Sequence, residues 1–105
     1  MNDEEFDPVI HVPARLRMMV TLATLPEGDD LSFTRLGEVI GLTPGNLITH
    51  LRKLEAAKYV TTVRSGRGVT ARTSISITRQ GRSALDRYSA IVRDLLSSAR
   101  PEQRG

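Results

Sequence analysis

The hydrophobic positions of the first sixty residues recur with a period of about 3.6, which predicts three helices. The first covers residues 9–25 or 13–25, the second residues 33–40 and the third residues 43–57. The inward positions of these helices are, in order, Val12, Leu16, Met19, Val20 and Ala23; Phe33, Leu36, Val39 and Ile40; and Leu47, Leu51 and Leu54.

The third of these helices has the clearest start signal and two contrasting faces. Thr43 can accept a hydrogen bond from a free backbone N–H, and Pro44 has no N–H to leave unsatisfied. Opposite the three leucines lies a polar face that holds Gly45, Asn46, Thr49, Arg52 and Lys53, with His50 at its edge. Such a helix suits reading of the DNA major groove, although a solvated surface helix has a similar pattern. The short connection to the preceding helix is typical of a helix-turn-helix.

After the third helix the period changes to 2, which predicts a β-hairpin. Residues 59–64 alternate, and residues 73–77 alternate again. The loop between them, residues 65–72, contains two glycines with Arg67 near its tip. We therefore expect a flexible, positively charged loop.

Residues 78–99 are predicted to form the last helix, which Thr78 can cap and Pro101 ends. A helix of this size is about 33 Å long, more than a small core can cover. Its apolar residues are spaced by three and four, as in the seam of a coiled coil. We expect the far half to pack against a second copy of the chain, the alternative being that it folds back on its own domain. The candidate interface residues are Leu85, Tyr88, Val92, Leu95, Leu96 and Ala99.

The composition restricts the class of protein. The chain has 105 residues, enough for one domain, and it contains no cysteine, which excludes a disulfide framework and a thiolate metal site. Its first residues are acidic where a signal peptide would be basic, and no apolar run reaches membrane length. We therefore expect a cytoplasmic protein without a membrane partner.

The net charge of +3 is unevenly distributed along the chain. Residues 31–82 contain nine basic and two acidic side chains, a balance of +7, whereas residues 1–30 contain two basic and seven acidic, a balance of −5. A basic middle segment predicts a surface that faces a polyanion. Arg15 and Arg17 lie outside it. They could contact backbone phosphates, but we favour salt bridges within the chain, with the acidic arm, or across a dimer.

The sequence contains no set of residues that suggests catalysis. A single histidine at the rim of a leucine face, such as His50, more often packs and hydrogen-bonds locally. The glycines around Arg67 lack the lysine and the following helix of a phosphate-binding loop, so a hairpin tip is the stronger interpretation, with Arg67 a plausible phosphate contact. The carboxylates form no paired set for acid–base chemistry. We expect neither an enzyme nor a cofactor or metal site.

Three stretches resemble the winged helix-turn-helix domain of bacterial and archaeal transcription regulators, in particular short single-domain proteins of the MarR/ArsR-like group. They are residues 11–19 (HVPARLRMM), 33–55 (FTRLGEVIGLTPGNLITHLRKLE) and 72–82 (RTSISITRQGR), and the resemblance covers about residues 9–96. It implies a mainly α fold with a small β-hairpin (α+β), in the order helix, helix, helix, hairpin, helix. The corresponding division is a loose acidic arm (1–8), a DNA-binding domain (9–77), a dimerisation helix (78–99) and a flexible tail (100–105).

The resemblance also implies a function. In that family the third helix (43–57 here) enters the major groove, and terminal helices pair two subunits. The loop of the hairpin, called the wing (65–72 here), lies on the backbone or in the minor groove. The chain would thus be a sequence-specific regulator that binds double-stranded DNA as a homodimer. The alternative is a winged-helix module that binds another protein and no DNA. The candidate DNA-binding residues are Thr43, Gly45, Asn46, Thr49, His50, Arg52, Lys53, Arg64, Arg67 and Arg72.

The chain departs from the family pattern in two places. The family usually has glycine where this chain has Lys58, so Lys58 must adopt a left-handed conformation or the helix must end differently. Metal-sensing members use clusters of cysteine and histidine, whereas this chain has no cysteine and only two histidines, His11 and His50. A metal-sensing role is therefore not indicated.

Overall fold

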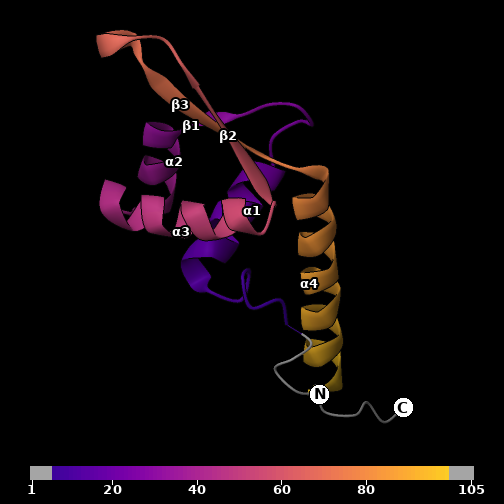
Figure 1. Ribbon diagram of the computed structural model, residues 1–105. Coiled ribbons are helices and arrows are strands. Elements are labelled where there is room, and N and C mark those ends of the chain that lie inside the picture. Colours follow the sequence, from indigo (N-terminus) through magenta and orange to yellow (C-terminus); the bar gives the residue numbers. More distant parts are fainter. Residues whose placement is uncertain (1–5, 100–105) are drawn as a thin grey trace.

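The computed structural model describes residues 6–99, which form four α-helices and a three-stranded antiparallel sheet (Figure 1). The elements are α1 (Pro13–Ala23), β1 (Leu31–Ser32), α2 (Phe33–Ile40), α3 (Pro44–Ala56), β2 (Val60–Ser65), the 3-10 turn η2 (Gly68–Thr70), β3 (Arg72–Ile77) and α4 (Arg79–Ser98). This order confirms the predicted mainly α fold with a hairpin. The predicted tail at 100–105 and the first five residues of the predicted arm lie outside the described residues.

The hairpin pairs β2 with β3 from Val60 opposite Ile77 to Ser65 opposite Arg72. Strand β1 adds to the other edge of β3, with Leu31 opposite Ile75, so the strand order is β1-β3-β2. The sequence did not predict β1, because two residues are too few to show an alternating pattern.

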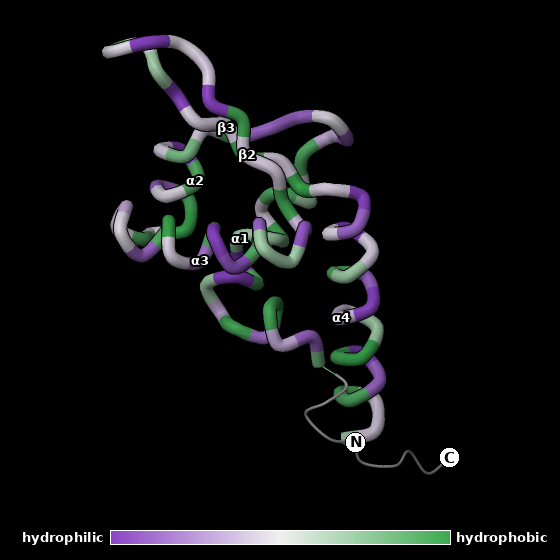
Figure 2. Tube along the Cα trace, in the orientation of Figure 1, coloured by the Kyte–Doolittle hydropathy of each residue, from purple (hydrophilic) through white to green (hydrophobic). Residues whose placement is uncertain are grey.

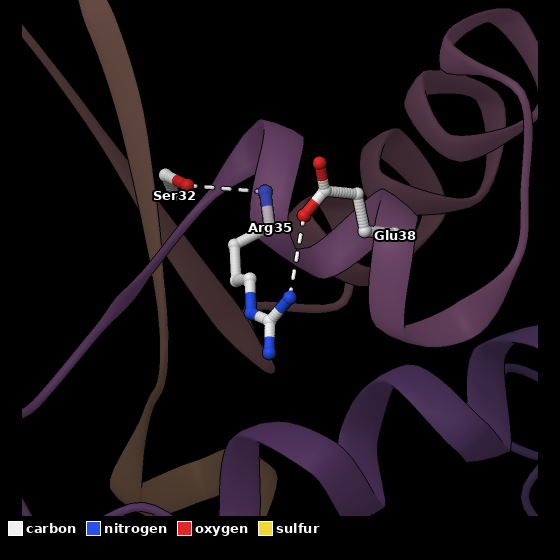
Figure 3. A network of polar contacts seen from close by, with 3 residues as sticks. All are labelled: Ser32, Arg35 and Glu38. Atoms are coloured by element: carbon white, nitrogen blue, oxygen red, sulfur yellow. Dashed lines mark hydrogen bonds and ion pairs between the residues drawn. The ribbon is translucent and has the colours of Figure 1, made fainter.

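Hydroxyl side chains cap three of the four helices. Ser32 accepts a hydrogen bond from the Arg35 backbone N–H at 3.1 Å, and the Arg35 guanidinium then lies 3.3 Å from Glu38 on the next turn (Figure 3). Both side chains of that ion pair are exposed, so we expect it to contribute little to stability. Thr43 and Thr78 cap α3 and α4 in the same way. Helix α1 begins at Pro13, the later of the two expected starts.

The core lies where α1, α2 and α3 meet the sheet. Its fully buried side chains are Ile10, Met18, Met19, Leu22, Leu36, Leu47, Leu51, Leu54 and Ile75. In Figure 2 hydrophobic and hydrophilic stretches alternate along α3 and α4, as expected of helices with one face inward. The prediction was wrong for Val20 and Val39, which are 45% and 49% exposed. Helix α1 buries Met18, Met19 and Leu22 and leaves Val20 outside, and α2 buries Leu36, Gly37 and Ile40 and leaves Val39 outside. Within residues 6–99 no helix combines the length and hydrophobicity needed to cross a bilayer.

Phe6 and Asp7 are anchored on the domain, so the prediction of a loose arm was wrong for these two residues. Phe6 is buried; its ring stacks on His11 with the centroids 4.6 Å apart and also contacts Tyr88 of α4. The Asp7 carboxylate accepts a hydrogen bond from the Tyr59 hydroxyl at the end of α3. Burial and this bond raise the pKa of Tyr59 to about 12. One aromatic residue in an acidic stretch gives no periodic signal, which is why the sequence did not reveal this anchor.

Helix α3 ends in a left-handed turn at Lys58, whose φ is 67°. The Tyr59 N–H bonds to the Leu54 carbonyl at 3.0 Å and the Lys58 N–H to the Glu55 carbonyl at 2.9 Å. These two bonds are those of a Schellman motif, in which glycine is the usual left-handed residue. Lys58 therefore takes the strained conformation, and the chain leaves α3 as it would with glycine.

Candidate nucleic-acid interface

The polar face of α3 is free of contacts with the core. Leu47, Leu51 and Leu54 are at most 2% exposed and hold the helix from behind. The residues predicted on the opposite side, Gly45, Asn46, Thr49, Arg52 and Lys53, are all exposed. The Thr49 hydroxyl donates to the Gly45 carbonyl at 3.0 Å, which fixes the direction of its side chain. Helix α3 thus presents a continuous row of polar groups on a rigid support.

His50 lies at the edge of this face and is half-buried against an arginine of α1. The Arg15 Nη1 lies 3.3 Å from the His50 Nδ1, and the Arg15 Nε–H donates to the Val9 carbonyl at 2.5 Å. Because a guanidinium has only donors, the His50 Nδ1 must be the acceptor, and the proton of the neutral ring is on Nε2. Among residues 6–99 Arg15 forms no salt bridge, and its pairing with the first residues of the chain or across a dimer stays a prediction. Sequence reasoning missed its contact with His50, since nothing along the chain relates two residues 35 positions apart.

The arginines of the hairpin lie on its exposed parts. Arg64, Arg67 and Arg72 are all exposed. Arg64 and Arg72 line a cavity of about 230 Å³ together with Ser32 and Thr34, at the start of α2. The N-terminus of a helix carries partial positive charge, so this corner combines two arginines with a favourable backbone dipole.

The hairpin tip, for which the sequence predicts a flexible, positively charged loop, forms a turn that its own hydrogen bonds close. The Thr70 hydroxyl donates to the Arg67 carbonyl at 2.7 Å and accepts from the Arg67 N–H at 3.1 Å. Gly66 and Gly68 have φ values of 81° and 57°, which allow the chain to turn here. The turn leaves Val69 fully exposed at its centre.

Arg82, one of the nine basic residues of the middle segment, faces the interior of the domain. Its guanidinium donates to the carbonyls of Ala23 and Leu25, each at 3.1 Å, at the end of α1. An arginine in this position satisfies free carbonyls and interacts favourably with the helix dipole. Its charge is therefore used within the fold and adds little to a polyanion-facing surface.

The candidate interface residues on α4 fall into two groups. Tyr88 is mostly a core residue of its own chain, with its hydroxyl 2.9 Å from the His11 Nδ1, although it also lines the groove described next, and its place in an interface stays a prediction. The others remain accessible. Leu85 and Val92 are half-buried and line a groove of about 350 Å³ with Leu16 and Val20, and Leu95, Leu96 and Ala99 are exposed where α4 extends past the core (Figure 1).

We found no arrangement suited to a metal ion among residues 6–99, since nowhere there do three or more histidine, aspartate or glutamate side chains converge. The polar groups that do gather belong to the face of α3 and to the hairpin. Their chemistry is that of hydrogen-bond donors and fixed cations, which suits a polyanion.

Comparison with known proteins supports this description. Residues 14–96 match the family described as winged helix DNA-binding domain. The uncharacterized protein MJ0432 of Methanocaldococcus jannaschii is 43% identical over 56 residues, which are 53% of this chain and 61% of that protein. The chain thus spans less than two thirds of this relative.

Two solved structures have a similar backbone. The transcriptional regulator homologue of Pyrococcus horikoshii OT3 has a TM-score of 0.76 and 28% identity, with 86% of each chain covered. MepR of S. aureus, solved as a complex with DNA, has a TM-score of 0.72 and 16% identity, with 91% of this chain and 76% of MepR covered. At that identity the likeness to MepR concerns the fold alone.

Proposed function

The protein belongs to the winged helix DNA-binding domain family, and on that premise we propose that it is a transcriptional regulator that binds double-stranded DNA. The observation that carries the proposal is the exposed polar face of α3, which the buried leucines hold rigidly from behind. The P. horikoshii protein is described as a transcriptional regulator homologue, and MepR was solved with DNA bound. The first relationship supports the same function here, and the second shows that a protein with this fold binds DNA.

In this proposal α3 enters the major groove, which is wide enough for one helix. Asn46 and Thr49 lie near its start and reach base edges. Arg52 and Lys53, further along, contact phosphates. The Nε2–H of His50, whose direction Arg15 helps to fix, is a further donor at the edge of the same face.

The hairpin contacts the adjacent DNA backbone. Arg64 and Arg72 stand beside the start of α2, where a phosphate would meet two guanidinium groups and the positive end of a helix dipole. Arg67, nearer the tip, contacts a further phosphate. These contacts add affinity and orientation without reading sequence.

We also propose that the protein acts as a homodimer joined through α4. The exposed leucines at the far end of α4 continue the apolar groove formed with α1. Two reading helices related by a two-fold axis would bind half-sites about one helical turn apart, roughly 10 bp. Leu95→Glu places a charge in this surface and should give a monomer in sedimentation, whereas Ser97→Glu on the other side of the helix should stay dimeric. A wild-type protein that is monomeric at tens of micromolar, about the weakest affinity of a useful dimer, would contradict this part.

The function is tested by binding to a duplex selected from a random library and to its scrambled counterpart. Asn46→Ala and Thr49→Ala should each weaken binding to the selected duplex by about 1–3 kcal/mol and reduce the preference for it. Binding to the scrambled duplex should change much less. If neither duplex binds, or if neither substitution matters, the docking of α3 in the groove is wrong and a protein-binding module becomes the better interpretation.

A further inference from the structure

The outermost side chain of the wing is apolar. Val69 lies at the centre of the one-turn helix η2 and is fully exposed, and its neighbours on either side of the turn are exposed as well. Isolated exposed hydrophobic residues are common and by themselves require no explanation. Here, however, the segment that carries the residue has a defined conformation, so Val69 has a fixed position.

The turn is built so that its shape depends on one glycine. A Cβ on Gly66 would lie 2.3 Å from the Thr70 carbonyl oxygen, closer than non-bonded atoms approach. The Thr70 hydroxyl then closes the turn by its two hydrogen bonds to Arg67. Valine is itself stiff, because its β-branch restricts χ1. A stiff apolar group on a closed turn loses little conformational entropy when it binds a surface.

The surroundings of Val69 indicate which surface this is. The hairpin carries three exposed cations, Arg64, Arg67 and Arg72, and no acidic residue lies between positions 60 and 77. An apolar tip flanked by cations is complementary to the minor groove of a duplex, whose walls are phosphates and whose interior is lined by sugar C–H groups and base edges. That groove is about 6 Å wide, enough for one small side chain.

On the basis of the proposed DNA binding, we propose that Val69 enters the minor groove and favours A·T over G·C pairs at its contact. The minor-groove edge of G·C carries the guanine 2-amino donor, which A·T lacks. An isopropyl group placed against the 2-amino group would exclude water from it without offering an acceptor. A buried donor left without an acceptor is costly in free energy. Val69 thus acts as a specificity-determining residue that works by exclusion, without a hydrogen bond to any base.

The test uses three alternating duplexes, poly(dA–dT), poly(dI–dC) and poly(dG–dC). Inosine lacks the 2-amino group, so I·C pairs have the minor-groove pattern of A·T and the major-groove pattern of G·C. Wild-type protein should bind poly(dI–dC) about fivefold or more tightly than poly(dG–dC), the ratio that corresponds to about 1 kcal/mol for one unsatisfied donor. Poly(dA–dT) has the same minor-groove pattern as poly(dI–dC), so Val69 should contribute equally to the affinity for both duplexes.

Two variants isolate the side chain. Val69→Ala removes most of the apolar group, and Val69→Thr keeps its shape but replaces one methyl with a hydroxyl that can accept from the 2-amino group. Both should bring the ratio between poly(dI–dC) and poly(dG–dC) close to one. Because each variant is compared with wild type on the same duplexes, differences in duplex flexibility cancel. Thermal unfolding should be unchanged in both, since Val69 makes no core contact.

The outcomes separate the two proposals. If wild-type protein binds all three duplexes but does not distinguish I·C from G·C, or if both variants keep the wild-type ratio, the role of Val69 is refuted while DNA binding stands. If no duplex is bound, the proposed function itself fails, and the exposed valine would then more simply contact a protein partner.

Discussion

The β2–β3 hairpin differs between its root, where it joins α3 and α4, and its tip around η2. The root is bonded to the ends of both helices, whereas the tip is bonded only to itself. The Thr78 N–H donates to the Tyr59 carbonyl at 2.9 Å and the Thr78 hydroxyl to the Lys58 carbonyl at 2.7 Å, so the end of α3 and the start of α4 are joined where the hairpin begins. Val60, the first residue of β2, is buried there. At the tip every residue from Thr61 to Thr70 except Thr62 is exposed, and the hydrogen bonds of η2 stay within the turn.

The root of the hairpin therefore helps to hold the domain together, whereas its tip is available to a ligand. A segment with buried side chains and bonds to several elements opens only when the whole domain unfolds. A protruding turn with local bonds can change without affecting the rest. We therefore expect substitutions at the root to lower stability, and substitutions at the tip to alter binding with little loss of stability.

Gly81→Ala should have the largest effect on stability. A Cβ at position 81 would lie 2.2 Å from the Tyr59 carbonyl oxygen, so α4 would have to move away from the end of α3. We expect the free energy of unfolding to fall by about 3 kcal/mol, at the upper end for an overpacked site. Urea denaturation measures this change.

Gly45→Ala is the matched control for Gly81→Ala, since a Cβ at position 45 meets no atom within 4 Å. Its stability should be unchanged or should rise by up to about 1 kcal/mol through better helix propensity. Equal stability of Gly81→Ala and wild type would show that the root is not tightly packed.

Lys58→Gly should have the next largest effect, in the opposite direction. Lys58 holds a φ of 67°, which is unfavourable for a residue with a Cβ. Glycine at this position should raise the free energy of unfolding by about 1 kcal/mol. Lys58→Ala, which loses the charge but keeps the Cβ, should give no such gain. If alanine stabilises as much as glycine, the effect comes from the lysine charge and the backbone at this position is not strained.

Gly66→Ala tests the tip with a clash like that of Gly81→Ala. The new Cβ would lie 2.3 Å from the Thr70 carbonyl oxygen, yet the tip can open to relieve it. The loss of stability should therefore stay below about 1 kcal/mol, the scale of local opening. Affinity for duplex DNA should fall severalfold because Val69 and Arg67 are displaced. A loss of stability as large as that of Gly81→Ala would mean that root and tip do not differ in the way described.

The parts of the fold that the sequence predicts are those with a local cause. The first residues of α2, α3 and α4 follow from their N-caps, Ser32, Thr43 and Thr78. The side chain of each cap accepts a hydrogen bond from the backbone N–H three residues further on. The alternation at 73–77 likewise gives β3 to within one residue, because half of that strand faces the core.

The remaining features depend on residues that are distant in the sequence. The contact of Arg15 with His50, the bonds from Arg82 to the end of α1 and the anchoring of Phe6 on Tyr88 all join such residues. Such contacts produce no periodic pattern in the sequence, so the sequence shows only that the side chains involved are charged or aromatic. The polar face of α3, by contrast, was predicted from helical spacing alone, and its residues are exposed as expected.

The central claim, that the wing arginines and α3 face the phosphates of a duplex, is tested most directly by the salt dependence of binding. The logarithm of the affinity of wild-type protein should fall linearly with the logarithm of the salt concentration, with a slope of roughly −0.9 for each phosphate contacted. Arg67→Ala should make the slope shallower by about one and weaken selected and scrambled duplexes alike. Arg87→Ala, which removes the same charge from α4, should leave the slope unchanged. Equal slopes for wild type and Arg67→Ala, or an equal change in Arg87→Ala, would contradict the account.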